Sequence, residues 1–370
     1  MKILIVGGGI AGLSLARALE RRGMQADLVE HHANEPAGGT GLYLPGNATR
    51  ALEQLGLLDL VRAEAVPINT QRILDSRGRP LSVTRTPDFW AECGPCLSLP
   101  RARLYGILRR SLSQSEIRFG VSVTDIRQAN GPCEVTFSDE TSAEYDLVVG
   151  ADGINSSVRE RVFSGVKPAY VGNVCWRFIT ANTAGIDGWT VMLGAGLTLL
   201  AIPVSEQDVY VYADMAVAGS EARAGIRDVS LITLFEEFAP PVFPLVADMP
   251  DGTPVHFGSI EQVVMDEWVR GRVVLIGDAA HAASPSMAEG AGMAMEDALV
   301  LAEILEGATD PDAALAAYTQ RRRPRVDWVQ KQCMARDKMR ALPSLARAGV
   351  LKLFGNALYK RAYTPLLERA

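Results

Sequence analysis

The sequence lacks the features of a disulfide-stapled, metal-binding or membrane-spanning protein. It has 5 cysteines in 370 residues, with one C-x-x-C pair and no second pair to match it. Its 4 histidines are too few and too scattered for a histidine metal cluster. No apolar run approaches the length that spans a bilayer, and the apolar N-terminus leads into a glycine-rich turn. We therefore expect a cytoplasmic protein with no bound metal and no stable membrane insertion.

An excess of basic residues is also missing. The net charge is −6, and the basic side chains are scattered except for Arg321, Arg322, Arg323 and Arg325, which we interpret as a solvated helix face. No broad footprint for a phosphate backbone exists, so nucleic acid is not expected as a partner. Hydrophobic residues make up 48% of the chain, which is typical of a globular protein with a buried core.

Residues that would serve nucleophilic catalysis are absent as well. No serine or cysteine lies in a nucleophile-elbow motif, and no catalytic triad is visible. Cys93 and Cys96 flank a Gly-Pro in a loop-like stretch, without the strand-to-helix context that activates redox thiols. We interpret them as incidental reduced thiols.

The strongest motif that is present lies at the N-terminus. The β-branched run KILIV at residues 2–6 predicts a strand, GGGIAG follows at once, and the apolar spacing of residues 13–23 predicts a helix. Gly7, Gly9 and Gly12 would permit the turn, the approach of a pyrophosphate and close helix packing. Glu30 ends the next predicted strand, where a carboxylate accepts both hydroxyls of a ribose. The pattern predicts a dinucleotide site but does not distinguish FAD from NAD.

Two further loops follow predicted strands. Residues 145–149 run into Gly150-Ala151-Asp152-Gly153 and a helix start, and residues 272–276 run into Gly277-Asp278 ahead of a helix from about Gly290. All three loops should meet at one sheet edge, the usual ligand position in open α/β sheets. A strand-end acid followed by helix amides suits a ribityl chain and a flavin ring better than nicotinamide.

Together these motifs resemble those of the single-component FAD aromatic hydroxylases, the family of para-hydroxybenzoate hydroxylase, over nearly the whole chain. GGGIAG at 7–12, GADG at 150–153 and GDAAHAASP at 277–285 are similar to the three family fingerprints. The sequence departs from the family's G-Q-G-x-N at Ala288-Glu289-Gly290-Ala291-Gly292. The resemblance implies an α/β fold: a Rossmann-like FAD-binding domain with an inserted, mainly antiparallel β-sheet substrate domain and C-terminal helices.

The expected domain organisation follows from this resemblance. The FAD-binding domain should comprise residues 1–75, 101–167 and 265–330, with a substrate-side excursion at 76–100, the substrate sheet at 168–264 and a C-terminal helical segment at 331–370. A helix beginning at Asp310 or Asp312 should be interrupted by Pro324. The amphipathic C-terminal stretch could cover the active-site region, a dimer surface or a membrane face. A monomer and a homodimer both stay open.

The resemblance also implies a set of cofactor-binding residues. Asp278 would bind the ribityl chain, Asp152 would lie near the pyrophosphate and the path of NAD(P)H, and Arg101 would lie near the FAD. The full expected set is Gly7, Gly9, Ile10, Ala11, Gly12, Glu30, His31, Gly41, Arg101, Val123, Asp152, Gly153, Gly277, Asp278, Gly290, Ala291 and Gly292.

Candidate catalytic residues lie in the flavin loop that follows Gly277-Asp278, in the predicted sheet and in the first domain, from which Tyr43 would approach the ring. They are Pro285, His281, Tyr212, Tyr210 and Tyr43. His281 would either hydrogen-bond the cofactor or cap nearby backbone, and strand alternation puts Tyr210 and Tyr212 on one face.

Further candidates for contact with the substrate are Trp176, Arg177 and Thr198 in the sheet and Asn47 near the ring. Arg177 could clamp an anionic substrate or face water or a salt-bridge partner.

The expected function is therefore that of an FAD-dependent monooxygenase. It would use NADH or NADPH and O2 to hydroxylate a small aromatic or heteroaromatic substrate through a flavin hydroperoxide, chemistry that needs little acid or base from the protein. The local pattern also resembles bacterial urate hydroxylases, but Thr198 stands where those place a substrate-binding arginine, which disfavours urate. The alternatives are another flavoenzyme of this fold (a ring-expanding oxygenase, a reductase or a halogenase-like enzyme) and a non-catalytic FAD-fold binding protein.

Overall fold

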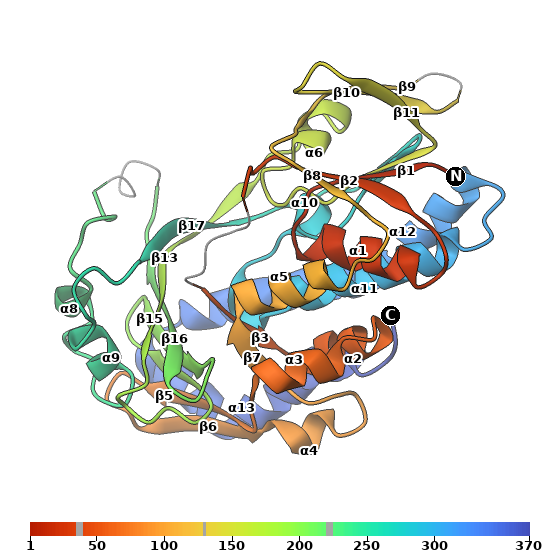
Figure 1. Cartoon of the computed structure of the whole chain (residues 1–370). Coiled ribbons are helices and arrows are strands. Elements are labelled where there is room, and N and C mark those ends of the chain that lie inside the picture. Colours follow the sequence, from red (N-terminus) through yellow and green to blue (C-terminus); the bar gives the residue numbers. More distant parts are fainter. Residues whose placement is uncertain (35–39, 129–130, 220–224) are drawn as a thin grey trace.

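The computed structural model describes residues 1–34, 40–128, 131–219 and 225–370, which form two sheet-centred regions joined by long helices (Figure 1). The first region is built on a six-stranded sheet in the order β18-β19-β12-β1-β2-β8. Its strands are parallel except for β18 at one edge. The strands are β1 (Ile3–Val6), β2 (Ala26–Glu30), β8 (Ile117–Phe119), β12 (Leu147–Gly150), β18 (Val269–Arg270) and β19 (Val273–Leu275).

Both faces of this sheet are covered, as its apolar strands require. All four residues of β1 and of β12 are buried, which is the pattern of strands with no solvated face. Three helices cover one face, and a small antiparallel sheet with one short helix covers the other (Figure 1). These elements are α1 (Ile10–Glu20), α5 (Arg101–Arg110) and α11 (Gly290–Leu305), then β9 (Val123–Gln128), β10 (Cys133–Phe137), β11 (Ser142–Tyr145) and α6 (Ser157–Val162).

The second region is a seven-stranded sheet in the order β17-β13-β16-β15-β14-β5-β6. Neighbouring strands are antiparallel except for the parallel pair β14 and β5, so the predicted inserted, mainly antiparallel sheet is confirmed. Two of its strands come from the N-terminal part of the chain. The strands are β5 (Thr70–Asp75), β6 (Pro80–Arg85), β13 (Ala169–Ala181), β14 (Trp189–Leu193), β15 (Leu197–Pro203), β16 (Asp208–Ala216) and β17 (His256–Gln262).

Strand alternation divides this sheet between two hydrophobic cores. Cys175, Tyr210 and Tyr212 belong to the core shared with the first region. Trp176 belongs to the opposite core, where α8 (Leu231–Leu234) and α9 (Phe243–Ala247) pack, and its ring lies 5.4 Å from that of Phe257. Trp176 is therefore not among the inward residues that could contact the substrate, because the next residue in the strand, Arg177, takes the inner face.

Short elements connect the two regions. A third sheet in the order β3-β7-β4 lies beside the helices α2 and α3, and α10 and the 3-10 turn η1 precede α11. Their bounds are β3 (Gly41–Leu44), α2 (Gly46–Gln54), α3 (Leu58–Glu64), β4 (Val66–Pro67), α4 (Thr86–Trp90), β7 (Leu97–Pro100), α10 (Asp278–His281) and η1 (Pro285–Met287).

The C-terminal part consists of α12 (Pro311–Arg340), α13 (Ser344–Tyr363) and the 3-10 turn η2 (Thr364–Leu366). The predicted interruption at Pro324 is wrong, because α12 continues through it. Arg322 and Arg325 flank the proline and bind carboxylates of α11, which offsets the missing backbone hydrogen bond. Among the helices described, none is long and apolar enough to cross a membrane.

The interpretation of the arginine cluster as a solvated face is also wrong in part. Arg322 has no exposed surface and the Arg325 side chain is 10% exposed, whereas Arg321 and Arg323 face outward. Positions 322 and 325 are one helical turn apart, so both side chains reach α11. Helical periodicity alone could not show that the carboxylates of Glu296 and Asp297 on α11 lie opposite these two arginines.

Candidate active site

The glycine turn between β1 and α1 has the packing that its spacing predicted. Gly7 has φ of +109°, and a Cβ there would lie 2.5 Å from the Ala151 carbonyl oxygen. A Cβ on Gly12 would overlap the carbonyl oxygen of Gly7, whereas one on Gly9 would meet no described atom within 4 Å. Gly7 and Gly12 are therefore required by the turn itself, and Gly9 leaves a bare backbone surface on which a pyrophosphate fits. Ile10 and Ala11 are buried in the first turn of α1.

Glu30 is held rigidly at the end of β2. Its Oε2 accepts the backbone N–H of Gly8 at 2.8 Å, and its Oε1 accepts that of His32 at 2.9 Å. The His31 ring lies outside, with Nδ1 3.0 Å from Oε1 of Glu30. This arrangement fits a carboxylate that receives ribose hydroxyls beside the glycine turn. Val123 is buried near the start of β9, with its side chain in the core.

Asp152 follows β12, the strand that pairs with β1, so it lies at the same sheet edge as Gly7. Its Oδ2 accepts the backbone N–H groups of Ser157 at 2.7 Å and Val158 at 3.1 Å, which caps α6. Its Oδ1 is buried and has no hydrogen-bond partner among the described residues. One oxygen thus fixes the loop, and the other keeps an unused acceptor at the edge where a cofactor would bind. Gly153 follows with φ of +77°.

Gly277 and Asp278 complete this edge at the end of β19. Gly277 has φ of +60°, and a Cβ there would lie 3.1 Å from the Cβ of Ala11, so the two loops touch. Asp278 is exposed in the first turn of α10, and the position of a Cβ on Gly290 is 3.9 Å from its Oδ1. The free N–H groups at the start of α11 therefore lie beside the Asp278 carboxylate. The carboxylate can accept hydrogen bonds from a ribityl chain, and the N–H groups can donate to an electron-rich ring.

The remaining expected residues of this group lie close to Asp278. Arg101 begins α5, and Asp278, Arg177 and Tyr210 are the charged or polar groups that interact with it electrostatically. Gly41 begins β3, and a Cβ there would lie 2.5 Å from the Cβ of Tyr210. Ala291 and Gly292 follow Gly290 in the first turn of α11. The structure thus brings residues from segments far apart in the chain to one region.

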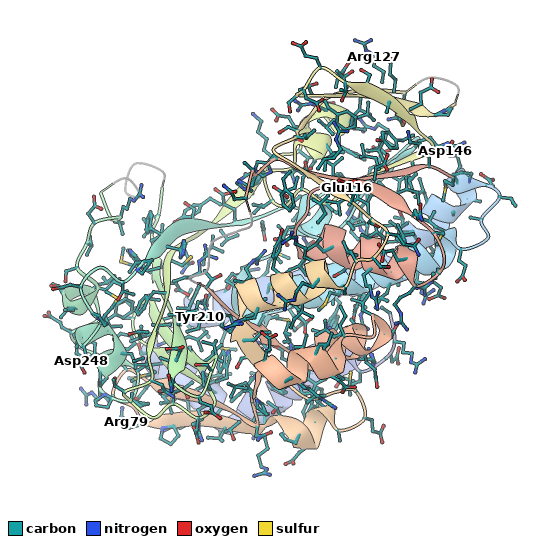
Figure 2. All side chains as sticks on the ribbon, viewed as in Figure 1. Arg79, Glu116, Arg127, Asp146, Tyr210 and Asp248 are labelled. Atoms are coloured by element: carbon teal, nitrogen blue, oxygen red, sulfur yellow. The ribbon has the colours of Figure 1, made fainter. Side chains whose placement is uncertain are left out.

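The inner face of the seven-stranded sheet covers this region. Tyr210 lies between the sheet and α5, as Figure 2 shows, and burial raises its pKa above the ordinary value. Tyr212 is also buried, and no described residue makes a hydrogen bond of normal geometry to its hydroxyl. Arg177 is half-buried on the neighbouring strand and pairs with Tyr212 in the register. The Tyr212 hydroxyl lies beside the Asp214 carboxylate, so Tyr212, Asp214 and Arg177 form a polar group on this face that can meet a polar substituent of a ligand.

Tyr43 contacts this sheet face at β5, because Gln71 lies on it in the strand register. Its hydroxyl accepts a hydrogen bond from Gln71 Nε2 at 2.8 Å, and burial raises its pKa well above the ordinary value. The residue therefore stays a neutral phenol that joins β3 to β5 of the substrate sheet.

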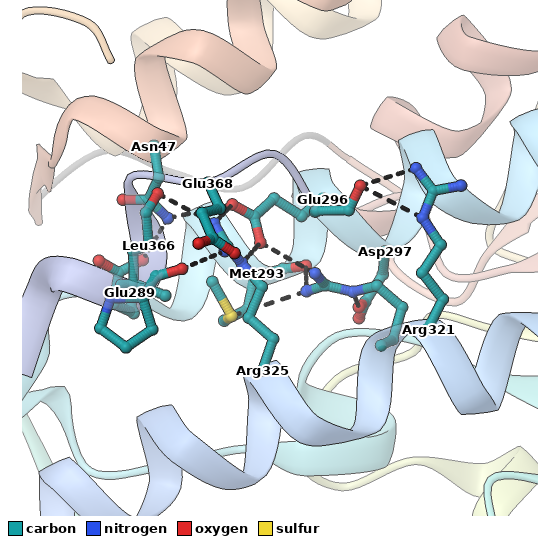
Figure 3. A network of polar contacts seen from close by, with 12 residues as sticks. Asn47, Glu289, Met293, Glu296, Asp297, Arg321, Arg325, Leu366 and Glu368 are labelled. Atoms are coloured by element: carbon teal, nitrogen blue, oxygen red, sulfur yellow. Dashed lines mark hydrogen bonds and ion pairs between the residues drawn. The ribbon is translucent and has the colours of Figure 1, made fainter. Parts of the chain in front are cut away.

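His281 points into the core. Its Nε2 lies 2.6 Å from Asp297 Oδ2, which also accepts the backbone N–H of Gly277 at 2.8 Å. Asp297 Oδ1 accepts Arg322 Nε at 2.7 Å. Burial by itself would raise the pKa of Asp297, but His281 and Arg322 outweigh it and lower the pKa to about 2. His281 thus fixes the loop that presents Asp278, and Figure 3 shows the adjoining charge network.

Glu289 takes the place of the glutamine in the G-Q-G-x-N motif that the sequence resembles, and its side chain is buried. Its Oε2 accepts Asn47 Nδ2 at 2.9 Å, and its Oε1 is buried without a hydrogen-bond partner among the described residues. Burial and the nearby Glu296 raise its pKa to about 8, against the opposite effects of the Asn47 bond and Arg325. Asn47 also donates to Glu296 Oε1 at 3.3 Å, so one amide bridges two carboxylates (Figure 3).

A second polar network was missed by reasoning from the sequence. Asp214, on the same strand face as Tyr212, binds Arg340 Nη1 at 2.6 Å. Arg340 in turn binds Asp337, which accepts the hydroxyls of Ser284 and Ser286 on either side of Pro285. Pro285 itself is exposed at the start of η1. The sheet is therefore tied to the loop that carries Pro285.

A signal for this network exists in the sequence. Asp214 interrupts the apolar strand DVYVYADM. Burying a carboxylate inside a strand costs free energy unless a cation or hydrogen-bond donor pairs with it. The pattern could not identify Arg340 as the partner, because 126 residues separate the two.

Comparisons with known proteins agree with this geometry. Residues 1–332 match the family described as FAD binding domain. The 2-heptyl-3-hydroxy-4(1H)-quinolone synthase of Pseudomonas aeruginosa is 34% identical over 341 residues, which cover 90% of this chain and 87% of the relative. The aurachin C monooxygenase/isomerase of Stigmatella aurantiaca is 30% identical, over 86% of this chain and 84% of the relative.

The structural comparison adds a Klebsiella pneumoniae protein whose crystal structure holds FAD and uric acid. It has a TM-score of 0.88 and 26% identity, and the match covers 99% of this chain and 97% of that one. The FAD-dependent urate hydroxylase of the same organism is 31% identical over 88% of this chain and 87% of the relative.

The chain therefore belongs to the FAD-binding domain family. It is an FAD-dependent monooxygenase, an oxidoreductase, as its motifs predicted. The predicted resemblance to aromatic hydroxylases, with similarity to urate hydroxylases, is confirmed.

Proposed function

We propose that this protein uses NADH or NADPH and O2 to hydroxylate a small heteroaromatic substrate, with a ring of the 4-quinolone kind in preference to urate. The observation that carries the proposal is the character of the sheet face opposite the FAD-binding edge. Leu200 and Ile202 of β15 lie on this face with Tyr210 and Tyr212 of β16. An apolar and aromatic face with few polar groups suits a fused ring.

Thr198 supports the preference over urate. It is buried on β15, and its hydroxyl lies beside the Asp214 carboxylate. It stands where urate hydroxylases, by resemblance, carry a substrate-binding arginine. The synthase from Pseudomonas aeruginosa, which is 34% identical to this chain, adds support through the quinolone in its name.

The residues present fit FAD, because the bare Gly9 backbone, the unused Asp152 oxygen and the start of α11 lie along one edge. When bound, FAD would supply the redox chemistry, taking electrons from NADH or NADPH and activating O2 as a flavin hydroperoxide. The chain would supply binding, orientation and exclusion of water. The hydroxyl of Tyr212 would donate to or accept from a ring substituent, and the half-buried Arg177 would favour an anionic form of the substrate.

The test is a screen of NADH and NADPH oxidation by the FAD-loaded protein with 4-quinolones, hydroxypyridines, phenols and urate. We expect a quinolone to stimulate oxidation most and its product to gain the mass of one oxygen. Tyr212→Phe should lower kcat/KM by about tenfold, since a hydrogen bond in a dry site contributes on the order of 1.4 kcal/mol. Tyr170→Phe is the matched control, because the Tyr170 hydroxyl donates to the Val217 backbone.

Each alternative outcome has a distinct meaning. A product from urate and none from quinolones would overturn the substrate preference. Stimulated oxidation without a mass gain for any compound would overturn hydroxylation.

A further inference from the structure

Helix α13 has two unlike faces. Arg347, Leu351, Gly355 and Tyr359 recur every four residues and are buried against the molecule. A Cβ on Gly355 would overlap the side chain of Ser82, so the helix lies directly on β6. In Figure 1, α13 lies beside β5 and β6, at the end of the molecule opposite the six-stranded sheet.

The other side of α13 is exposed and carries large apolar side chains among basic ones. Leu345 is 91% exposed, Leu353 77% and Phe354 55%. Val83, on the adjacent β6, is 45% exposed, so the apolar surface extends from the helix onto the sheet. We call these four side chains the α13 face. Few soluble surfaces gather large apolar groups in this way without a partner.

A groove runs along this face. It has a volume of about 290 Å³ and lies between β6 and α13, with Leu81, Val83, Leu351 and Leu353 among its lining residues. The main chain of Gly355 forms part of its floor. Ser82, Lys352 and Asn356 also line it, so the groove offers polar as well as apolar contacts.

The charge of α13 indicates the partner. The helix contains Arg347, Lys352, Lys360 and Arg361 and no acidic residue, in a chain whose net charge is −6. Lys352, Lys360 and Arg361 are exposed. A helix with exposed leucine and phenylalanine among lysines and arginines is typical of segments that lie in the interface of an anionic bilayer.

We propose that the α13 face rests on an anionic lipid surface, with Leu353 and Phe354 inserted among the lipid chains. Lys352 and Lys360 would contact the headgroups. Charge decides against a second copy of the chain as the occupant, because pairing two α13 helices would bring cations against cations with no acid on either helix. This association goes beyond the proposed function and does not depend on it.

Sedimentation with vesicles tests this surface. The full-length, FAD-loaded protein is mixed with phosphatidylcholine vesicles that contain or lack phosphatidylglycerol, at low and high salt. We expect binding that requires the anionic lipid and weakens with salt. Leu353→Glu/Phe354→Glu should lower the partition coefficient at least tenfold. Leu60→Glu is the matched control, since Leu60 is 57% exposed on α3, away from α13.

A second variant keeps the test decisive if Leu353→Glu/Phe354→Glu does not fold. Loss of FAD absorbance would reveal such a failure. Lys352→Glu/Lys360→Glu should abolish the preference for anionic vesicles. The proposal is overturned if the wild-type protein does not sediment with anionic vesicles, or if both variants bind like wild type. It is also overturned if light scattering shows a dimer that Leu353→Glu/Phe354→Glu dissociates, because the face would then belong to a second copy.

Discussion

Glu289 should make the stability of this protein depend on pH in an unusual direction. Its carboxyl group is 3% exposed, and burial with the nearby Glu296 raises its pKa from 4.5 to about 8. Between these two values the folded chain holds a proton that the unfolded chain releases. The free energy of unfolding therefore falls as the pH rises through this window, and the stabilising effect of the bound proton is complete only below the unfolded pKa.

The size of the effect follows from the shift. One pKa unit corresponds to about 1.4 kcal/mol, so the contribution lost between pH 5 and pH 8 is roughly 4 kcal/mol at most. Glu289→Gln replaces the neutral acid with a neutral amide of the same shape, which can keep the contact with Asn47. The variant should match wild type near pH 5 and exceed its stability by several kcal/mol at pH 8.

The measurement is denaturant unfolding of both proteins, each freed of FAD, at steps from pH 5 to pH 8. Asp214 also has a raised pKa because it is buried, so wild type alone would not isolate Glu289. The difference in the free energy of unfolding between wild type and Glu289→Gln does isolate the contribution of Glu289. Glu53→Gln, an exposed position on α2, is the control and should leave the pH dependence unchanged. Parallel pH curves for wild type and Glu289→Gln would refute the reasoning.

Three further changes have expected outcomes. Gly12→Ala should abolish FAD retention, measured by absorbance after desalting, because its Cβ would overlap the carbonyl oxygen of Gly7; retention equal to wild type would contradict this. Arg322→Met should lower the free energy of unfolding by about 3–5 kcal/mol, since it leaves two buried carboxylates without their shared cation, and a loss below about 1 kcal/mol would contradict this. Arg340→Met should destabilise the fold by about 3 kcal/mol by leaving Asp214 unpaired. It should also loosen the flavin loop and raise the share of NAD(P)H oxidation that yields hydrogen peroxide, and unchanged coupling would argue against that link.

The nucleotide edge was predictable because its determinants are local. Gly7, Gly12 and Glu30 lie within one strand-turn-helix-strand unit, and their roles depend on backbone conformation that the sequence itself specifies. The alternation of the sheet strands likewise predicted that Tyr210 and Tyr212 share a face. Alternation could not say which face was inner, and so it could not choose between Trp176 and its neighbour Arg177.

The sequence by itself determined the family, the cofactor-binding edge and the class of chemistry, because short motifs encode the backbone around phosphates and ribose. Only the tertiary structure decided which charged residues are buried and which partners they contact. Arg322 and Glu289 could each have faced water, and each is buried beside a partner far away in the chain, while Arg340 is half-buried against Asp214. Burial removes water from these groups, and only three-dimensional packing determines which distant charge or amide takes its place.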